Sequence, residues 1–124
     1  MSAMSDVGAI AGDIETWLRP LADADGPCGA DLEYDNEFLA LAQAAAGKPE
    51  TQFSAAEPPD WSAVVAGAAS LLGRTRDLRL AVYWARGVVH EAGFDAVAPA
   101  LSLVAGLVEH FWDAVHPLPD PDDG

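Results

Sequence analysis

The chain has 124 residues, a net charge of −14 and a hydrophobic content of 51%. This length is that of one domain with a single core. The acidic charge repels phosphate backbones and anionic membrane surfaces, so we expect neither nucleic-acid nor membrane binding. The 25 alanines favour closely packed helices, while 12 Val and Ile residues are few for a sheet core.

The first expected helix begins near Asp6 and ends at Pro20. Its apolar residues recur at helical spacing: Val7, Ile10, Ile14, Trp17, Leu18 and Leu21. The following residues 22–34 contain Gly26, Pro27 and Gly29. They predict an ordered turn or an extended crossing segment.

Two further helices are delimited by residues that typically end or cap helices. A helix is expected over 36–46, with Asp35 as its N-cap and Gly47 as its stop. The three prolines of residues 47–60 predict a mobile loop. The next helix begins at Trp61 and ends at Gly73.

A fourth helix is expected over about residues 77–92, and it is apolar on most sides, which predicts a central position. Its narrow polar stripe consists of Arg79, Tyr83, Arg86 and His90. A fifth helix follows Gly93, with Asp95 as its candidate cap, and ends before Pro117. Its expected inward face consists of Leu101, Val104, Ala105, Val108, Trp112 and Val115, and Leu103, Leu107 and Phe111 widen it. Its expected polar face consists of Ser102, Gly106, Glu109 and Asp113.

These elements predict an all-α fold: one compact domain of about five helices over residues 1–117. We expect residues 118–124 to be a flexible, acidic, Pro-rich linker. A single cysteine forms no internal disulfide, and no signal peptide or apolar span is visible, so we expect a cytoplasmic protein.

The alternating acidic residues of segment 31–37 resemble the start of a calcium loop. Counted from Asp31, however, the sixth and twelfth positions hold Asn36 and Ala42 instead of Gly and Glu. We therefore expect no metal or other cofactor. Asp35 has a simpler role as a helix cap.

Cys28 is a candidate nucleophile with one of the three histidines, but no catalytic cysteine signature surrounds it. A small buried residue in a tight turn is the simpler interpretation. The histidines lack metal-ligand spacing, and we expect His116 to lie at a helix end, where its charge suits the dipole.

Four arginines stand close together in the sequence: Arg74, Arg76, Arg79 and Arg86. We expect them to bind the acidic segment 31–37 and fix it against the fourth helix, because Arg–carboxylate pairs suit that role.

A set of short phrases in a fixed order resembles the N-terminal domain of the TssA (ImpA-type) proteins of bacterial type VI secretion systems. The residues that carry the resemblance are Pro27, Cys28, Gly29, Asp31, Leu32, Tyr34, Asp35, Phe38, Trp61, Asp77, Leu78, Arg79, Gly93, Phe94, Trp112, Asp113, His116 and Pro117. No single phrase is specific, but the ordered set is.

The resemblance implies a cytoplasmic, non-enzymatic docking domain that contacts structural subunits of the baseplate and the tube–sheath, and helps to prime or cap sheath assembly. The family's ring-forming region is C-terminal to this domain, so we expect this chain alone to be monomeric. Two alternatives remain: a small cysteine-dependent hydrolase, and an acidic decoy domain that binds basic proteins.

Leu32 and Tyr34 alternate with carboxylates in the acidic segment. An aromatic ring with a charged rim is typical of an interface hot spot. Alternatively, both side chains pack inward and hold the segment on the helices, as apolar residues in ordered turns more often do.

Overall fold

The computed structural model describes residues 3–22 and 25–119. Its elements are α1 (Ala3–Trp17), α2 (Asn36–Ala46), α3 (Trp61–Leu72), α4 (Leu78–Ala92), the short 3-10 helix η1 (Phe94–Ala96) and α5 (Val97–His110). Within the described ranges there is no named strand, and the expected all-α fold is confirmed. None of the helices there is both long and apolar enough to cross a bilayer.

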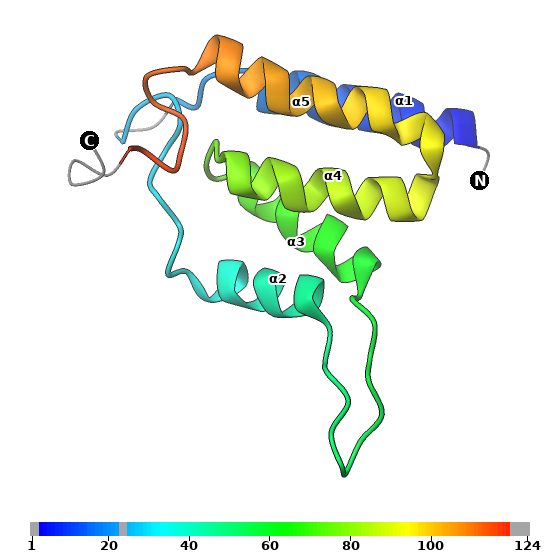
Figure 1. The fold of residues 1–124 in the computed structure, drawn as a ribbon. Coiled ribbons are helices and arrows are strands. Elements are labelled where there is room, and N and C mark those ends of the chain that lie inside the picture. The colour runs from blue at the N-terminus through cyan, green and yellow to red at the C-terminus, as the bar shows by residue number, and fades with distance from the viewer. Residues whose placement is uncertain (1–2, 23–24, 120–124) are drawn as a thin grey trace.

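Helix α4 lies at the centre of the molecule (Figure 1). It contacts α1, α3 and α5, while α2 packs on α3 at the far side from α1 and α5. Trp84 of α4 is 1% exposed, and Trp17 of α1 meets it edge-on with 5.1 Å between ring centroids. The fourth predicted helix is apolar on most sides because other helices pack against it on several sides.

Three helices begin at aspartate caps. The side chain of Asp35 accepts from the Glu37 amide, that of Asp60 from the Ala63 amide, and that of Asp77 from the Arg79 amide. Each bond satisfies an N–H group that has no partner inside its helix. The predicted bounds of α2 and α3 are confirmed.

The first helix differs from its prediction at both ends. It begins at Ala3, earlier than Asp6, and ends at Trp17 rather than Pro20. The residue before a proline is disfavoured in helical conformation, so the helix stops ahead of it. Val7 lies outside the residues whose side chains are described, as do residues 120–124 of the predicted linker.

The inward face predicted for the last helix is partly right. Leu103, Leu107, Phe111 and Val115 are buried as expected, whereas Leu101 is 61% and Trp112 74% exposed, and Ala100 is buried in addition. Gly106 belongs to the buried face, because a Cβ there would come within 2.7 Å of Leu18. The helix also ends at His110 and lacks a side-chain cap from Asp95. Helix α5 is apolar on two faces, and the core uses the face of Ala100, Leu103, Gly106 and Leu107.

Residues 47–60 form an arm whose two sides are joined by backbone hydrogen bonds, and its mobility stays a prediction. Lys48 and Glu57 exchange backbone hydrogen bonds of 2.9 and 2.8 Å, and the Thr51 amide donates to the Ser54 carbonyl at 2.9 Å. These antiparallel bridges hold the two sides of the arm together as it projects from the body (Figure 1). We refer to residues 47–60 as the arm.

Arg76 is a buried charge, 3% exposed, and its guanidinium donates only to backbone carbonyls. Its acceptors are Thr16 and Arg19 at the end of α1, at 3.3 and 3.2 Å, and Leu72, the last residue of α3. Carbonyls at helix C-termini generally lack helical partners, although that of Thr16 also accepts from the Arg19 amide at 3.2 Å, and the negative end of each helix dipole favours a cation. Burial lowers the pKa of this guanidinium, which nevertheless stays charged.

Replacing Arg76 by Met is expected to lower the free energy of unfolding by about 3 kcal/mol, because the buried bond to Leu72 and the partly buried bonds to Thr16 and Arg19 are lost. Urea unfolding followed by circular dichroism measures the change. Arg19→Met is the matched control, since Arg19 only pairs with Glu15 on the surface. Equal unfolding midpoints for the two variants would contradict the role given to Arg76.

Candidate functional site

Three segments of the resemblance motif meet side by side in the structure. The Arg76 amide donates to the Cys28 carbonyl at 2.8 Å, and the His116 amide donates to the Arg76 carbonyl at 3.1 Å. The Leu78 amide then donates to the His116 carbonyl at 2.8 Å. Segments far apart in the sequence therefore form one backbone cluster, which we call the motif cluster: residues 27–30, 75–78 and 115–117.

Side-chain hydrogen bonds from Thr75 and His116 also join the segments of the motif cluster. The Thr75 hydroxyl lies 2.9 Å from the Cys28 carbonyl and 2.7 Å from the Ala30 carbonyl. The His116 ring, 7% exposed, places Nε2 at 2.8 Å from the Gly29 carbonyl, which requires Nε2 to carry the proton. The expected helix-end position of His116 is therefore wrong.

Gly29 is required in the motif cluster for two reasons. Its φ of +70° is a conformation that L side chains rarely adopt. In addition, a Cβ at this position would lie 2.6 Å from the Arg74 carbonyl oxygen. Pro27 and Gly29 therefore shape a turn that carries the backbone close to residues 74–76.

Cys28 is 2% exposed and lies inside the motif cluster. Burial raises the pKa of its thiol, and the Arg76 charge opposes that rise only in part. The thiolate is the reactive form of cysteine, so this environment suits packing better than nucleophilic attack. Cys28 is the small buried residue that its sequence context indicates.

Two arginines bind the acidic segment 31–37, as expected. Arg79 forms two bonds to the buried Asp77, at 3.1 and 2.7 Å, and reaches Asp31 at 2.9 Å and Glu33 at 3.7 Å. Asp77, as the largest cause, and Asp31 raise the pKa of Arg79. The segment is thereby fixed at the start of α4.

Arg74 forms the second ion-pair group with the segment. It reaches Asp35 at 2.8 Å and Glu37 at 3.7 Å, and its hydrogen bond is the main cause of the lowered pKa of Asp35. The same expectation is wrong for Arg76, which binds backbone carbonyls, and for Arg86, which lies over the Trp61 ring.

Leu32 and Tyr34 have different environments. Leu32 packs against the core, as the inward interpretation predicts. Tyr34 is 85% exposed, so that interpretation is wrong for this residue. Its ring stands in solvent next to the carboxylates that bind Arg79.

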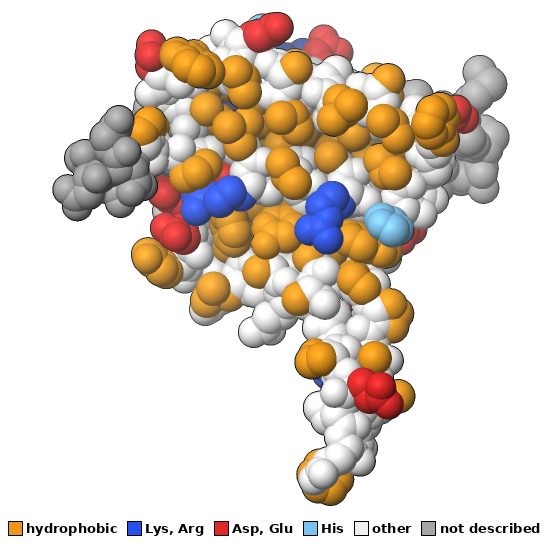
Figure 2. Space-filling model, viewed as in Figure 1, with side chains coloured by type: hydrophobic (Ala, Val, Ile, Leu, Met, Phe, Trp, Pro, Cys, Tyr) orange, Lys and Arg blue, Asp and Glu red, His pale blue; other side chains and the backbone are white. Residues whose placement is uncertain are grey.

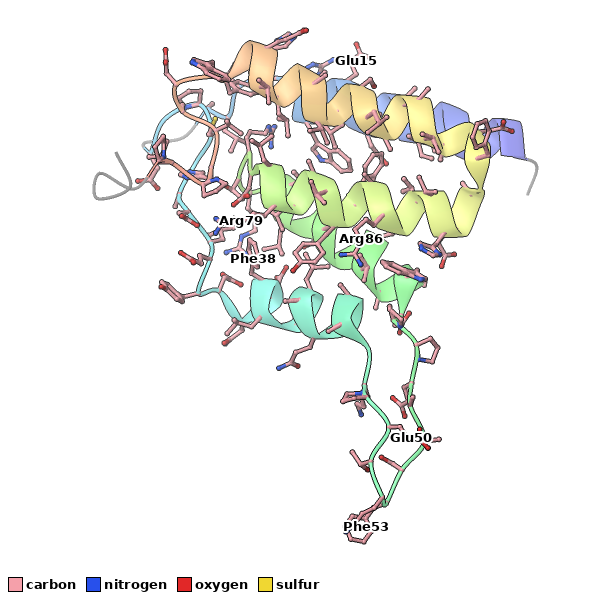
Figure 3. All side chains as sticks on the ribbon, in the orientation of Figure 1. Glu15, Phe38, Glu50, Phe53, Arg79 and Arg86 are labelled. Atoms are coloured by element: carbon pink, nitrogen blue, oxygen red, sulfur yellow. The ribbon has the colours of Figure 1, made fainter. Side chains whose placement is uncertain are left out.

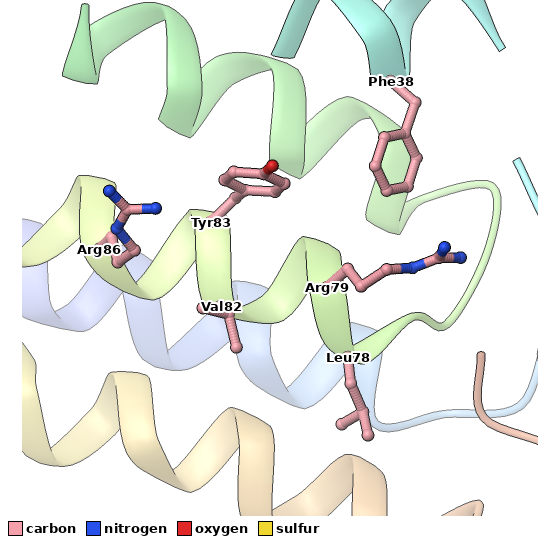
Figure 4. A pocket seen from close by; sticks show the side chains of 6 residues that line it. All are labelled: Phe38, Leu78, Arg79, Val82, Tyr83 and Arg86. Carbon is pink, nitrogen blue, oxygen red and sulfur yellow. The ribbon is translucent and has the colours of Figure 1, made fainter. Parts of the chain in front are cut away.

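A groove lies beside the motif cluster, between α2 and α4, with a cavity volume of about 430 Å³ (Figure 4). Its lining residues are Phe38, Leu78, Arg79, Val82, Tyr83 and Arg86, and we call it the α2–α4 groove. Phe38 and Tyr83 meet edge-on with 6.5 Å between centroids, and the Arg79 guanidinium lies 5.2 Å from the centre of the Phe38 ring. The partly exposed Tyr83 and two arginines thus stand at the surface next to the buried Phe38 ring.

Arg86 differs from the other basic residues. All six Lys and Arg residues lie in the described ranges. Arg19, Lys48, Arg74 and Arg79 pair with carboxylates, and Arg76 is buried. Arg86 has no carboxylate partner among the described residues, and it contacts only the Trp61 ring, on which His90 also stacks. On this strongly acidic protein, Arg86 is therefore an exposed cation that a partner could bind.

The sequence alone did not identify this groove. Arg79, Tyr83 and Arg86 were recognised as the polar stripe of the fourth helix, but Phe38 comes from another helix. Across residues 3–22 and 25–119 no group of three or more His, Cys, Asp or Glu side chains could hold a metal ion. The arrangement offers a recognition surface that combines the Tyr83 ring, the aliphatic side chains of Leu78 and Val82, and the Arg86 cation.

Comparisons with known proteins agree on one family. Residues 18–124 match the family described as ImpA, N-terminal, type VI secretion system. The chain is 47% identical over 110 residues to the type VI secretion system component TssA1 of Pseudomonas aeruginosa, covering 86% of this chain and 32% of that protein.

A solved structure is also similar: the N-terminal domain, including the conserved ImpA_N region, of the TssA component from Burkholderia cenocepacia. It superposes with a TM-score of 0.72 at 38% identity, over 89% of this chain and 41% of that chain. The chain thus spans about a third of the curated relative it matches.

Replacing Arg79 by Met is expected to lower the free energy of unfolding by about 3 kcal/mol, because the fully buried Asp77 carboxylate loses its charged partner. Arg86→Met is the matched control on the same helix, and it should change stability little because no carboxylate is left unpaired. Urea unfolding of both variants tests this. Similar midpoints would show that the Arg79–Asp77 pair does not hold the start of α4.

Proposed function

The chain belongs to the ImpA N-terminal family of type VI secretion proteins, and on that premise we propose that it is a non-enzymatic docking domain of a cytoplasmic assembly factor. Its partners in this proposal are structural subunits of the baseplate and the tube–sheath, and its role is to prime or cap sheath assembly. The chain itself supplies a binding surface.

The observation that carries the proposal is the α2–α4 groove with its free cation. Interfaces are enriched in aromatic residues and arginine, and these supply most hot spots. Tyr83 is partly exposed beside the buried Phe38, Val82 is 47% exposed, and Arg86 makes no ion pair among the described residues. Tyr34, one residue after the Glu33 that contacts Arg79, is another exposed aromatic residue.

The apolar surface continues from α4 onto α5. A second hollow between the two helices includes Arg86, Val89 and Leu101, so the two hollows share the same arginine. Figure 2 shows hydrophobic side chains spread over this face, with two groups of arginine atoms along it. Contiguous exposed apolar surface rimmed by polar groups is typical of protein-interaction sites.

The alternatives have less support. A cysteine-dependent hydrolase would need an accessible thiolate, whereas Cys28 is 2% exposed with a pKa raised by burial. An acidic decoy would bind through carboxylates, whereas Asp31, Asp35 and Asp77 are already paired with arginines of the same chain. Neither alternative uses the aromatic groove.

The proposal predicts which substitutions weaken docking without unfolding the domain. The chain is titrated against each purified baseplate and tube–sheath subunit, and the subunit that binds is used for variants. Val82→Asp and Tyr34→Ala are each expected to weaken binding about thirtyfold, roughly 2 kcal/mol, because both side chains are exposed contacts. Their urea unfolding midpoints should stay close to that of the unchanged chain.

Phe94→Ser is the matched control, since Phe94 is an 88% exposed aromatic residue outside the groove. It should bind normally. If no structural subunit binds the unchanged chain, the docking function is wrong. If one binds but Val82→Asp has no effect, the groove is not its site.

A further inference from the structure

The arm ends in an exposed aromatic residue. Phe53 stands at its tip and is 89% exposed (Figure 3). The arm projects from the body on the side of α2, and the described structure contains no ring contact to Phe53 (Figure 3). The chain therefore holds a large apolar ring in solvent at its outermost point.

The tip is held in place by a compact hydrogen-bond network. The Phe53 and Ser54 amides lie 3.3 and 3.1 Å from the Thr51 Oγ1 that accepts from them. The hydroxyls of Thr51 and Ser54 are 3.0 Å apart, and the two residues also pair through their backbones. A side chain presented on an ordered turn loses less conformational freedom on binding, which favours its use as a contact.

The arm also carries a free carboxylate beside the ring. Lys48 and Glu57 pair across the base of the arm at 3.7 Å. Glu50, three residues before Phe53, is exposed and makes no ion pair among the described residues. The tip thus combines an apolar ring with one unpaired negative charge.

The α2–α4 groove has the complementary chemistry. Its cavity of about 430 Å³ falls in the range of roughly 300–1,000 Å³ typical of binding pockets, enough for an aromatic side chain. The partly exposed Tyr83 offers a ring for stacking or edge contacts, and the exposed Val82 adds apolar surface beside it. Arg86 offers the unpaired cation, within one helix turn of Tyr83 on α4.

Charge selects where an acidic arm from another copy can dock. Two chains of net charge −14 repel one another over most of their surfaces. Arg86 is the exposed cation that no carboxylate of the described chain neutralises. An incoming Glu50 is therefore attracted to the groove and disfavoured at acidic surfaces.

We propose that the arm of one copy docks into the α2–α4 groove of a second copy, with Phe53 against Tyr83 and Val82 and Glu50 against Arg86. Arm and groove are different surfaces, so the contact is head-to-tail. One arm in one groove buries less surface than a standard interface, so the pairing is weak and the dilute chain remains monomeric. The contact uses the groove of the proposed docking function, and it would compete with a docked subunit.

Complementation between two defective variants tests this contact. Phe53→Ser removes the arm's ring, and Arg86→Glu reverses the groove's cation. Sedimentation velocity at increasing protein concentration is expected to show association of the unchanged chain, and at least tenfold weaker association of each variant alone. An equal mixture of the two variants should form dimers. The Arg86→Glu variant still has an intact arm, and the Phe53→Ser variant still has an intact groove, so one arm–groove contact can form. The dimer should not grow further, because its remaining arm and groove are the defective ones.

Two controls make the result specific. Phe94→Ser removes an equally exposed ring and should associate like the unchanged chain. A chain carrying both Glu50→Arg and Arg86→Glu should regain association that each single reversal loses. Circular dichroism confirms that every variant is folded.

The contact is wrong if the unchanged chain stays monomeric at every concentration. It is also wrong if association survives both Phe53→Ser and Arg86→Glu, or if their mixture fails to pair. Binding of a secretion subunit is measured separately on Phe53→Ser, which loses self-pairing but keeps the groove. Loss of self-pairing with retained subunit binding, or the reverse, therefore distinguishes this inference from the proposed function.

Discussion

The rest of the structure depends on the compensation of one buried charge. Arg76 has no carboxylate partner among the described residues, and its guanidinium binds carbonyls at the ends of α1 and α3 instead. A buried cation must be compensated, and helix C-termini offer both unpaired acceptors and negative partial charge. The backbone on either side of this charge pairs with Cys28 and His116, so one residue joins two helix ends and two crossing segments.

The same cluster sets the position of the recognition surface. Asp77 follows Arg76, caps α4 and binds Arg79, and Arg79 in turn holds Asp31 and contacts Phe38 of α2. These contacts, one following from another, place α2 beside α4, and the groove forms between the two helices. The motif residues thus act mainly in architecture, whereas the side chains suited to partners lie next to them on the surface.

Local signals in the sequence were sufficient for α2, α3 and α4, because Asp caps and glycine stops mark their ends. They were insufficient for α5, which has two apolar faces; the contact between Gly106 and Leu18 selects the buried one. The role of Arg76 could not be read from side-chain pairing, since its acceptors are backbone carbonyls. The groove needed the juxtaposition of Phe38 with α4, which no local pattern encodes. The family resemblance, carried by the ordered motif residues, is confirmed.

Native-state hydrogen exchange of the motif cluster's amides is the most direct test of this account. The amides of Arg76, Leu78 and His116 bond across segments remote in the sequence. If the cluster holds the fold together, these three amides should exchange only through global unfolding, with a free energy equal to that of the most protected amides of α4. Exchange of the three amides by local opening, while the interior of α4 stays protected, would contradict it.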